Sequence, residues 1–221
     1  MDALVNEFPR YVEGFFGTLR ISLFAAVGAL MIGTLLAGFR VSPVPPLRWI
    51  GTAWVTVFRN SPLAVMLFVF AFALPLAGVT FPTLGGNAFF WPGVSALVCY
   101  TAAFVCEAVR SGINSVPSGQ AEAARAVGLT FQQTLGAVVL PQALRTVVPP
   151  LGSVIIAMIK NSAIVGAFGV TGELFSVDAA NTAIGYSALS SLTGVAIAYL
   201  CITIPAGLAL GAIERRIEVK R

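Results

Sequence analysis

Residues 88–106 contain no charged side chain, and a run of this kind is long enough to cross most of a lipid bilayer. A helix needs about 20 apolar residues to cross a hydrocarbon core roughly 30 Å thick. The whole chain is 57% hydrophobic and 10% charged, a balance far from that of a soluble domain. We therefore expect an all-α membrane protein with five transmembrane helices. The expected spans are about 15–39, 53–77, 88–107, 140–160 and 188–211, between an N-terminal segment 1–14 and a tail 213–221.

The Lys and Arg residues are distributed unevenly between the two sides that five spans define. With the N-terminus outside, the outer side holds only Arg10, Arg20 and Lys160, and the other basic residues are inside. Because cytoplasmic segments carry an excess of Lys and Arg, we expect the N-terminus outside and the C-terminus inside. The acidic segment 1–13 lacks the basic start of a cleaved signal peptide, so the first span is expected to be retained. The net charge of +4 is then attributed to topology and to contact with anionic membrane lipid, not to nucleic acid.

The sequence offers few residues from which a catalytic site could be built. It has no histidine and its three cysteines form no CxxC motif, so no metal site is expected. Glu107 is the only acid near the interior of an expected span, and no second acid lies within a helical turn of it. No GxxxxGK[ST] phosphate loop is present. We expect no catalytic residue and no nucleotide site in this chain, which leaves transport, a channel or a scaffold.

Residues 118–142 form a polar segment between the third and fourth expected spans, with helix signals of its own. Ser118 is expected to cap a short helix over residues 119–127, and Gly128 to end that helix in a left-handed conformation. Thr130 and Gln133 have the spacing of a capping box, so a second helix is expected to start there. Pro141 is expected to kink or re-cap this second helix where the chain re-enters the membrane.

The first of these short helices has the features of a docking surface. Ala121, Ala124 and Gly128 share a face without bulk, and Glu122 and Arg125 project beside it. Small residues let another protein approach the backbone closely, and a flanking acid and base fix its register. The alternative is a solvated loop lying on the membrane, which requires neither the glycine turn nor the alanine stripe.

The same segment resembles a known family motif. Glu122-Ala123-Ala124, the glycine six residues after Glu122, and the run Val138-Val139-Leu140-Pro141 are similar to the EAA loop of ABC-importer permeases, with Val138 in place of the usual Ile. Three other runs resemble signatures of the polar amino-acid uptake permeases: Arg59-Asn60-Ser61-Pro62-Leu63, CEAVRSGINSVPSGQ and Lys160-Asn161-Ser162. The resemblance covers residues 15–212, and the runs VCEAVRSGIN, GQAEAARAVGL and ERRIEVKR resemble actinobacterial glutamate-uptake permeases.

This resemblance implies a type I ABC-importer transmembrane domain over residues 15–212, in the bacterial cytoplasmic (inner) membrane. It implies alternating access for glutamate or another acidic or polar amino acid. The implied partners are two ABC ATPase subunits, a second permease chain (itself or a sister) and an extracytoplasmic amino-acid-binding protein. ATP and Mg²⁺ would be bound by the ATPase, with no cofactor in this chain. Residues 118–141 would be the cytoplasmic coupling loop, and its implied coupling residues are Glu122, Ala123, Ala124, Arg125, Gly128 and Pro141.

Polar residues within the expected spans or directly at their ends are the candidates for contact with cargo. Lys160 is expected at the outer end of the fourth span, where its ammonium group either serves an anionic amino acid or anchors the helix end at the membrane surface. The stretches 96–103 and 152–159 contain no acid, which disfavours arginine, lysine or histidine as cargo. The candidates for the substrate pathway are Lys160, Asn161, Ser162, Ser153, Tyr100 and Thr101.

Arg59 and Glu107 are both expected near the cytoplasmic half of their spans, and they are predicted to form a structural ion pair. Two other functions stay open on the sequence. The first is an ATPase-docked membrane sensor or scaffold, which would show no flux stimulated by a binding protein. The second is a passive channel or secondary carrier, which would depend on an ion gradient and would leave the EAA spacing unexplained.

Overall fold

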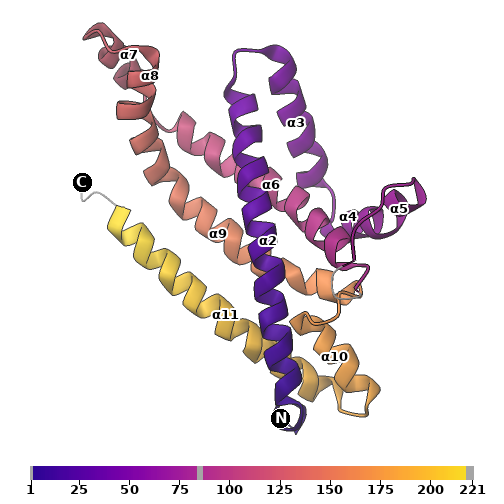
Figure 1. Ribbon diagram of the computed structural model, residues 1–221. Coiled ribbons are helices and arrows are strands. Elements are labelled where there is room, and N and C mark those ends of the chain that lie inside the picture. The colour runs from indigo at the N-terminus through magenta and orange to yellow at the C-terminus, as the bar shows by residue number, and fades with distance from the viewer. Residues whose placement is uncertain (1, 84–86, 218–221) are drawn as a thin grey trace.

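The computed structural model describes residues 2–83 and 87–217, and its architecture is a tilted bundle of helices (Figure 1). Four helices in this part of the chain are long and apolar enough to cross a membrane. They are α2 (Phe8–Val41), α6 (Phe90–Asn114), α9 (Leu140–Ala167, preceded without a break by α8 and η2) and α11 (Ala188–Ile217). The other elements are α1 (Asp2–Asn6), α3 (Pro45–Asn60), α4 (Leu63–Phe68), the π-helical η1 (Val69–Ala73), α5 (Leu74–Leu76), α7 (Ser118–Ala126), α8 (Phe131–Thr134), the π-helical η2 (Leu135–Val139) and α10 (Leu174–Ala183).

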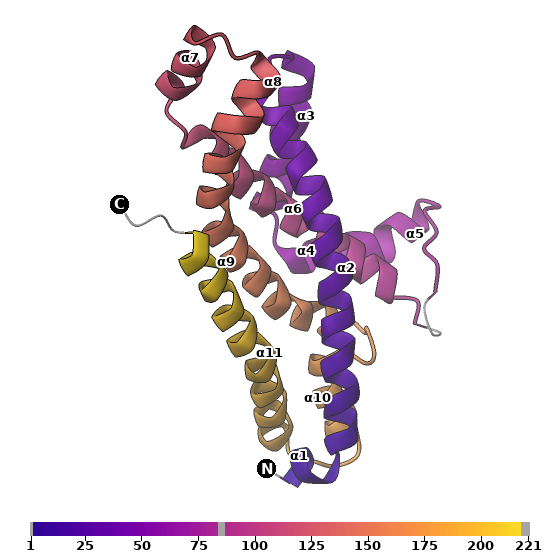
Figure 2. The same ribbon diagram turned by 60° about the vertical axis from the view of Figure 1, so that its left-hand side comes forward.

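The two ends of the bundle carry different elements. The N-terminus, α1 and α10 lie at one end, and α7 and α8 lie at the other, in both views (Figures 1 and 2). The last helix, α11, contacts α1 near its start and runs toward the end that carries α7. This arrangement agrees with an odd number of crossings, while the N-outside orientation itself stays a prediction.

The second expected span, residues 53–77, is not one helix. α3 ends at Asn60, α4 begins at Leu63, and the two helix directions differ by 107°. Pro62 disfavours helical geometry at the residue before it, and Ser61 is extended, with φ −98° and ψ 138°. The stretch from α4 to α5 is only about 20 Å long at 1.5 Å per residue, shorter than the hydrocarbon core. This part of the chain is therefore a broken span or a re-entrant loop, and α3 packs back along α2.

The centre of the bundle is the contact between α2 and α6, where small residues let the two backbones approach. A Cβ on Gly33 would lie 2.6 Å from Cβ of Val105 and 2.8 Å from the carbonyl oxygen of Ala102. Ala29, Ala102 and Val105 are fully buried around this contact. In lipid there is little hydrophobic driving force between helices, so such close packing is what holds them together.

Gly33→Val is expected to destabilise the protein by roughly 1–3 kcal/mol, because the added atoms would collide with Val105 and with a backbone carbonyl. The measurement is the apparent melting temperature of the purified protein in detergent. Gly38→Val is the matched control on the same helix, since a Cβ there meets nothing within 4 Å. Equal melting temperatures for the two variants would contradict this account of the packing.

α6 and α9 run antiparallel and touch at both ends of their overlap. Near one end Gly112 packs on Val147, and near the other Gly93 packs on Val165, so that a Cβ on either glycine would overlap the valine side chain. The two helices are therefore held together at two separated points. Between these points the helices enclose a cavity.

Candidate functional site

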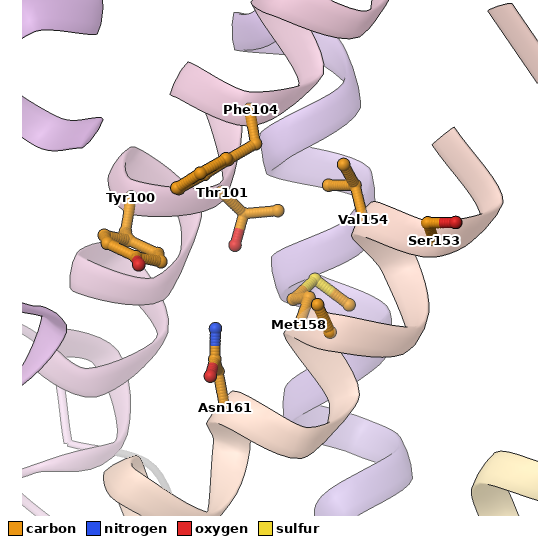
Figure 3. A pocket seen from close by; sticks show the side chains of 8 residues that line it. Tyr100, Thr101, Phe104, Ser153, Val154, Met158 and Asn161 are labelled. Atoms are coloured by element: carbon orange, nitrogen blue, oxygen red, sulfur yellow. The ribbon is translucent and has the colours of Figure 1, made fainter. Parts of the chain in front are cut away.

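The cavity between α6 and α9 has a volume of about 280 Å³ (Figure 3). Small-molecule sites usually measure about 300–1,000 Å³, and this volume lies just below that range, so the cavity suits only a small ligand. Four of the six residues predicted for the substrate pathway line it, namely Tyr100, Thr101, Ser153 and Asn161. The remaining lining residues are Phe104 on α6 and Val154, Ala157 and Met158 on α9.

The cavity combines apolar walls with a few neutral polar groups. The Asn161 amide points from α9 toward Tyr100 and Thr101 on α6, whereas the Ser153 hydroxyl points away from them (Figure 3). The rings of Tyr100 and Phe104 are in contact, with centroids 5.0 Å apart. None of the lining residues is charged. These groups can exchange hydrogen bonds with a polar ligand, but they provide no counter-ion for one.

Lys160 and Ser162 are adjacent to Asn161 in the sequence but do not line the cavity. α9 continues past Lys160 to Ala167, and the Lys160 side chain is exposed on this helix. The place of Lys160 at the outer end of the fourth span stays a prediction. Ser162, which was predicted for the substrate pathway, is fully buried. Its hydroxyl group lies 2.8 Å from the carbonyl oxygen of Ile159.

Glu107 lies among three arginines and not in a simple pair. The predicted partner, Arg59, is 54% exposed, and its Nη1 lies 3.9 Å from Glu107 Oε1. The main partner is Arg40, whose Nη1 bonds the same oxygen and whose side chain is only 12% exposed. Arg110 Nη1 lies 3.6 Å from Oε2. Arg40 was missed because the first span was expected to end at residue 39, whereas α2 continues to Val41.

Glu173, directly before α10, is a buried acid that the sequence analysis did not identify. Its carboxyl group contacts the hydroxyl groups of Thr18, Ser162 and Tyr199. No local pattern could have found this site, because its members are far apart in the sequence. Burial raises the pKa of the Glu173 carboxyl group above its ordinary value, and the hydrogen bonds that it accepts offset part of this effect.

The polar segment after α6 forms the two predicted short helices. Gly128, which follows α7, has a φ of +93°, as expected for a left-handed residue at this place. The Thr130 amide donates to Gln133 Oε1 at 2.9 Å and the Gln133 amide donates to Thr130 Oγ1 at 3.3 Å, so the predicted capping box is confirmed. The prediction for Ser118 is wrong, because Pro117 takes the N-cap position in extended geometry and Ser118 is already helical.

The two alanines of the small-residue face of α7 are turned toward their own chain, whereas Gly128 is exposed. Ala124 is only 8% exposed, and α7 packs against η2. The outward face carries Glu122, Ala123 and Arg125, which are exposed. The alanine stripe therefore anchors α7, and the charged face is what another protein could contact. Pro141 lies in the first turn of α9, directly after the π-helical η2.

A larger hollow of about 750 Å³ lies between α1, α2 and α11, but its lining is almost wholly apolar. The Tyr11 hydroxyl on this lining already donates to the carbonyl oxygen of Ser191 and accepts from the Asn181 amide. A site for a polar ligand needs polar groups that orient it. We therefore take the smaller cavity between α6 and α9 as the candidate site.

Long apolar helices around a small neutral cavity, with an anchored charged helix at one end, define a multi-pass membrane protein of the transport class. The chain belongs to the family of binding-protein-dependent transport system inner membrane components, whose family model matches residues 29–219. It is therefore a permease subunit located in the inner membrane.

Relatives and solved structures agree with this assignment. The chain is 39% identical over 215 residues to the probable glutamine ABC transporter permease protein GlnM of Bacillus subtilis, covering 97% of this chain and 96% of that protein. It is 36% identical over 220 residues to the glutamate transport system permease protein GluC of Corynebacterium glutamicum, covering 96% of each. A chain in the crystal structure of an amino acid ABC transporter with histidines has a TM-score of 0.88 and 30% identity, with 97% of both chains covered. The predicted all-helical ABC-importer fold is confirmed.

Proposed function

We propose that this permease imports an amino acid with an acidic or polar side chain, glutamate foremost, with energy from a separate ATPase. The observation that carries the proposal is the neutral cavity between α6 and α9, whose hydrogen-bonding groups suit a polar ligand of this size. The chain is similar to permeases that are named for glutamine and for glutamate, which supports the same class of cargo.

The charges in and near the cavity favour an anionic or neutral cargo. No acid lines the cavity, so a cationic side chain would lose its hydration there without gaining a partner. Glu107 lies one turn beyond the lining residue Phe104 on α6, and three arginines share its single negative charge. The resulting positive potential beside the cavity attracts a carboxylate.

We assign contact with the ATPase to the outward face of α7, formed by Glu122, Ala123 and Arg125. The ATPase subunit would bind ATP and Mg²⁺. Ala124 and Gly128 support this surface from within the chain, the first by packing and the second by its turn. The predicted topology places this end of the bundle in the cytoplasm.

A continuous helical path leads to the cavity from α8, which follows α7 directly after the turn at Gly128. α8, η2 and α9 follow one another without a break, and Pro141 lies in the first turn of α9, the helix that carries Ser153 and Asn161. Displacement of α7 by closing ATPase subunits would therefore move one wall of the cavity. Such movement of one helix set against another is how alternating access is achieved.

The complete transporter would contain two permease chains, two ATPase subunits and an extracytoplasmic binding protein. The exposure of α11 is an argument for a second permease chain. Only 6% of the 18-residue apolar stretch of this helix is buried by its own chain. Lipid covers part of such a face and a second chain, identical or a sister, would cover the rest.

A mild-detergent pull-down from native membranes, followed by uptake assays in proteoliposomes, tests the proposal. We expect an ATPase, a second permease chain and a binding protein to co-purify. We also expect uptake of labelled glutamate or glutamine to require ATP and to be inhibited by vanadate. Uptake driven by an ion gradient without an ATPase would identify a channel or secondary carrier, and ATPase binding without flux would identify a sensor or scaffold.

Asn161→Leu is expected to raise the KM for the cargo about tenfold. The change keeps the size of the side chain but removes a hydrogen bond to the ligand inside an apolar cavity, a loss of about 1.4 kcal/mol. Initial rates of uptake over a range of cargo concentrations measure this KM. Asn114→Leu, at an exposed position at the end of α6, is the matched control and should retain the wild-type KM. The same KM for both variants would remove Asn161 from the substrate pathway.

A further inference from the structure

Glu173 is fully buried and its carboxyl group has only neutral partners. Oε2 accepts the Phe175 amide at 2.7 Å. Oε1 lies 2.8 Å from Thr18 Oγ1 and 3.1 Å from Ser162 Oγ, and the Tyr199 hydroxyl also bonds it. No Lys or Arg of residues 2–83 and 87–217 is within salt-bridge distance of this carboxyl group. An ionised carboxylate buried without a cation is costly, so the arrangement needs an explanation.

The three hydroxyl groups belong to three different long helices. Thr18 is on α2, Ser162 on α9 and Tyr199 on α11, while Glu173 itself caps α10. Gly166 on α9 leaves the space that Glu173 Oε2 occupies, since a Cβ there would overlap that oxygen. The carboxyl group therefore joins four helices at one point.

This junction lies directly beside the cavity wall. Ser162 follows Asn161 in the sequence, and its hydroxyl group is 2.8 Å from the carbonyl oxygen of Ile159. Met158 and Asn161, on the same turn of α9, line the cavity. A rotation or shift of α9 at Ser162 would move both lining side chains, so the bond to Glu173 fixes their position from outside the cavity.

The hydrogens of the hydroxyl groups indicate which form of the carboxyl group fits. Thr18 Oγ1 accepts the Leu174 amide at 3.2 Å, so its own hydrogen is available for Glu173 Oε1. Ser162 has a single hydrogen, and the carbonyl oxygen of Ile159 is nearer to it than Oε1 is, at 2.8 Å against 3.1 Å. When Ser162 donates to that carbonyl, its contact with Oε1 needs a hydrogen on Glu173.

We propose that Glu173 is a positioning residue, whose protonated carboxyl group joins α9 to α2 and α11 and holds the Asn161 face of α9 in place. The inference rests on the proposed role of the cavity as the substrate pathway. Glu173 does not touch the cargo in this arrangement, because it is not among the residues that line the cavity.

Cargo uptake by the complete transporter in proteoliposomes tests the proposal. Glu173→Gln keeps the shape of the side chain, stays neutral and can donate an amide hydrogen to Ser162, but its nitrogen cannot accept the Thr18 hydrogen, so its KM should rise no more than about threefold. Glu173→Ala removes every bond at the junction and should raise the KM at least about tenfold, with a smaller effect on kcat. Tyr199→Phe removes one hydroxyl group only and should raise the KM about threefold, which provides a test if the alanine variant does not fold.

The pH profile separates the protonated form from a merely structural role. Burial raises the pKa of the Glu173 carboxyl group above its ordinary value of 4.5. The neutral form therefore persists at pH values above 4.5 and is lost as the pH rises through the raised pKa. The wild-type KM should therefore rise as the pH increases through this raised pKa, and the Glu173→Gln profile should stay flat. The elements that meet at the junction also carry Tyr11, Glu13 and Arg20 on α2, Lys160 on α9, Asp178 on α10, and Tyr199 and Cys201 on α11. Glu13→Gln and Asp178→Asn should keep the wild-type pH profile.

Two results would overturn the inference. A wild-type KM in Glu173→Ala would show that the junction does not position α9, and a Glu173→Gln variant as impaired as Glu173→Ala at every pH would rule out the neutral form. A failure of the cavity proposal differs from both, because Asn161→Leu would then keep the wild-type KM. A failure of the Glu173 inference alone leaves the effect of Asn161→Leu intact.

Discussion

Glu122→Arg is expected to reduce ATP-driven uptake at least about a hundredfold while the permease still folds and inserts. Glu122 is exposed on the outward face of α7 and makes no ion pair within the described residues, so its own chain does not depend on it. A charge reversed at a docking surface loses an attractive contact and adds a repulsive one, and losing one partner of a buried charge pair costs about 2–5 kcal/mol. Ala124 packs α7 against its own chain, and the turn at Gly128 and the capping box at the start of α8 define its connection to the next helix.

Co-purification of the ATPase and the initial rate of uptake are the two measurements. Asp2→Arg is the matched control, because it makes the same change of charge on an exposed acid at the opposite end of the bundle. We expect this control to bind the ATPase and to transport normally. Normal uptake by Glu122→Arg would show that α7 does not dock on the ATPase through this face.

The second large effect is expected for Glu107→Gln, which should destabilise the permease by about 3 kcal/mol. The change leaves three guanidinium groups near one another without a counter-ion, and one of them, on Arg40, is 12% exposed. Breaking a buried ion pair by removing one partner costs about 3–5 kcal/mol, and partial exposure of this cluster places the effect at the lower end. The apparent melting temperature and the yield of folded protein in detergent measure it.

Two further variants test the cause of this effect. Arg59→Gln should cost less than about 1 kcal/mol, because Arg59 is 54% exposed and 3.9 Å from the carboxylate. The double variant Arg40→Gln with Glu107→Gln should be more stable than Glu107→Gln alone, since it removes the most buried unpaired charge. A double variant less stable than Glu107→Gln would indicate that Arg40 acts through packing and not through its charge.

The local features of this protein could be predicted well from the sequence. The capping box of Thr130 and Gln133 and the turn at Gly128 are confirmed because both depend on residues within one helical turn. The failure at Ser118 is also local: Pro117, the residue before it, takes the cap position. The break within the second expected span has a similarly local cause, since Pro62 disfavours helical geometry at Ser61.

The candidate site was predicted in part. Tyr100, Thr101 and Asn161 were chosen as polar residues in apolar helices, and the structure places them around one cavity because Gly93 and Gly112 bring α6 and α9 together on either side of it. The sequence could not separate these residues from Lys160 or Ser162, since the rotation of α9 about its axis decides which face meets α6. That rotation is set by packing with other helices.

The sequence alone determined that the chain crosses a membrane, that it carries no evident catalytic chemistry, and that its polar segment resembles the EAA loop. Each of these depends on composition or on residues close together in the chain. Only the tertiary structure showed that Arg40 is the main partner of Glu107, that the alanine face of α7 is turned inward, and that Glu173 joins four helices. Ion pairs and buried hydrogen bonds form between whichever side chains the packed helices bring within a few ångströms, and those side chains can be more than a hundred residues apart in the sequence.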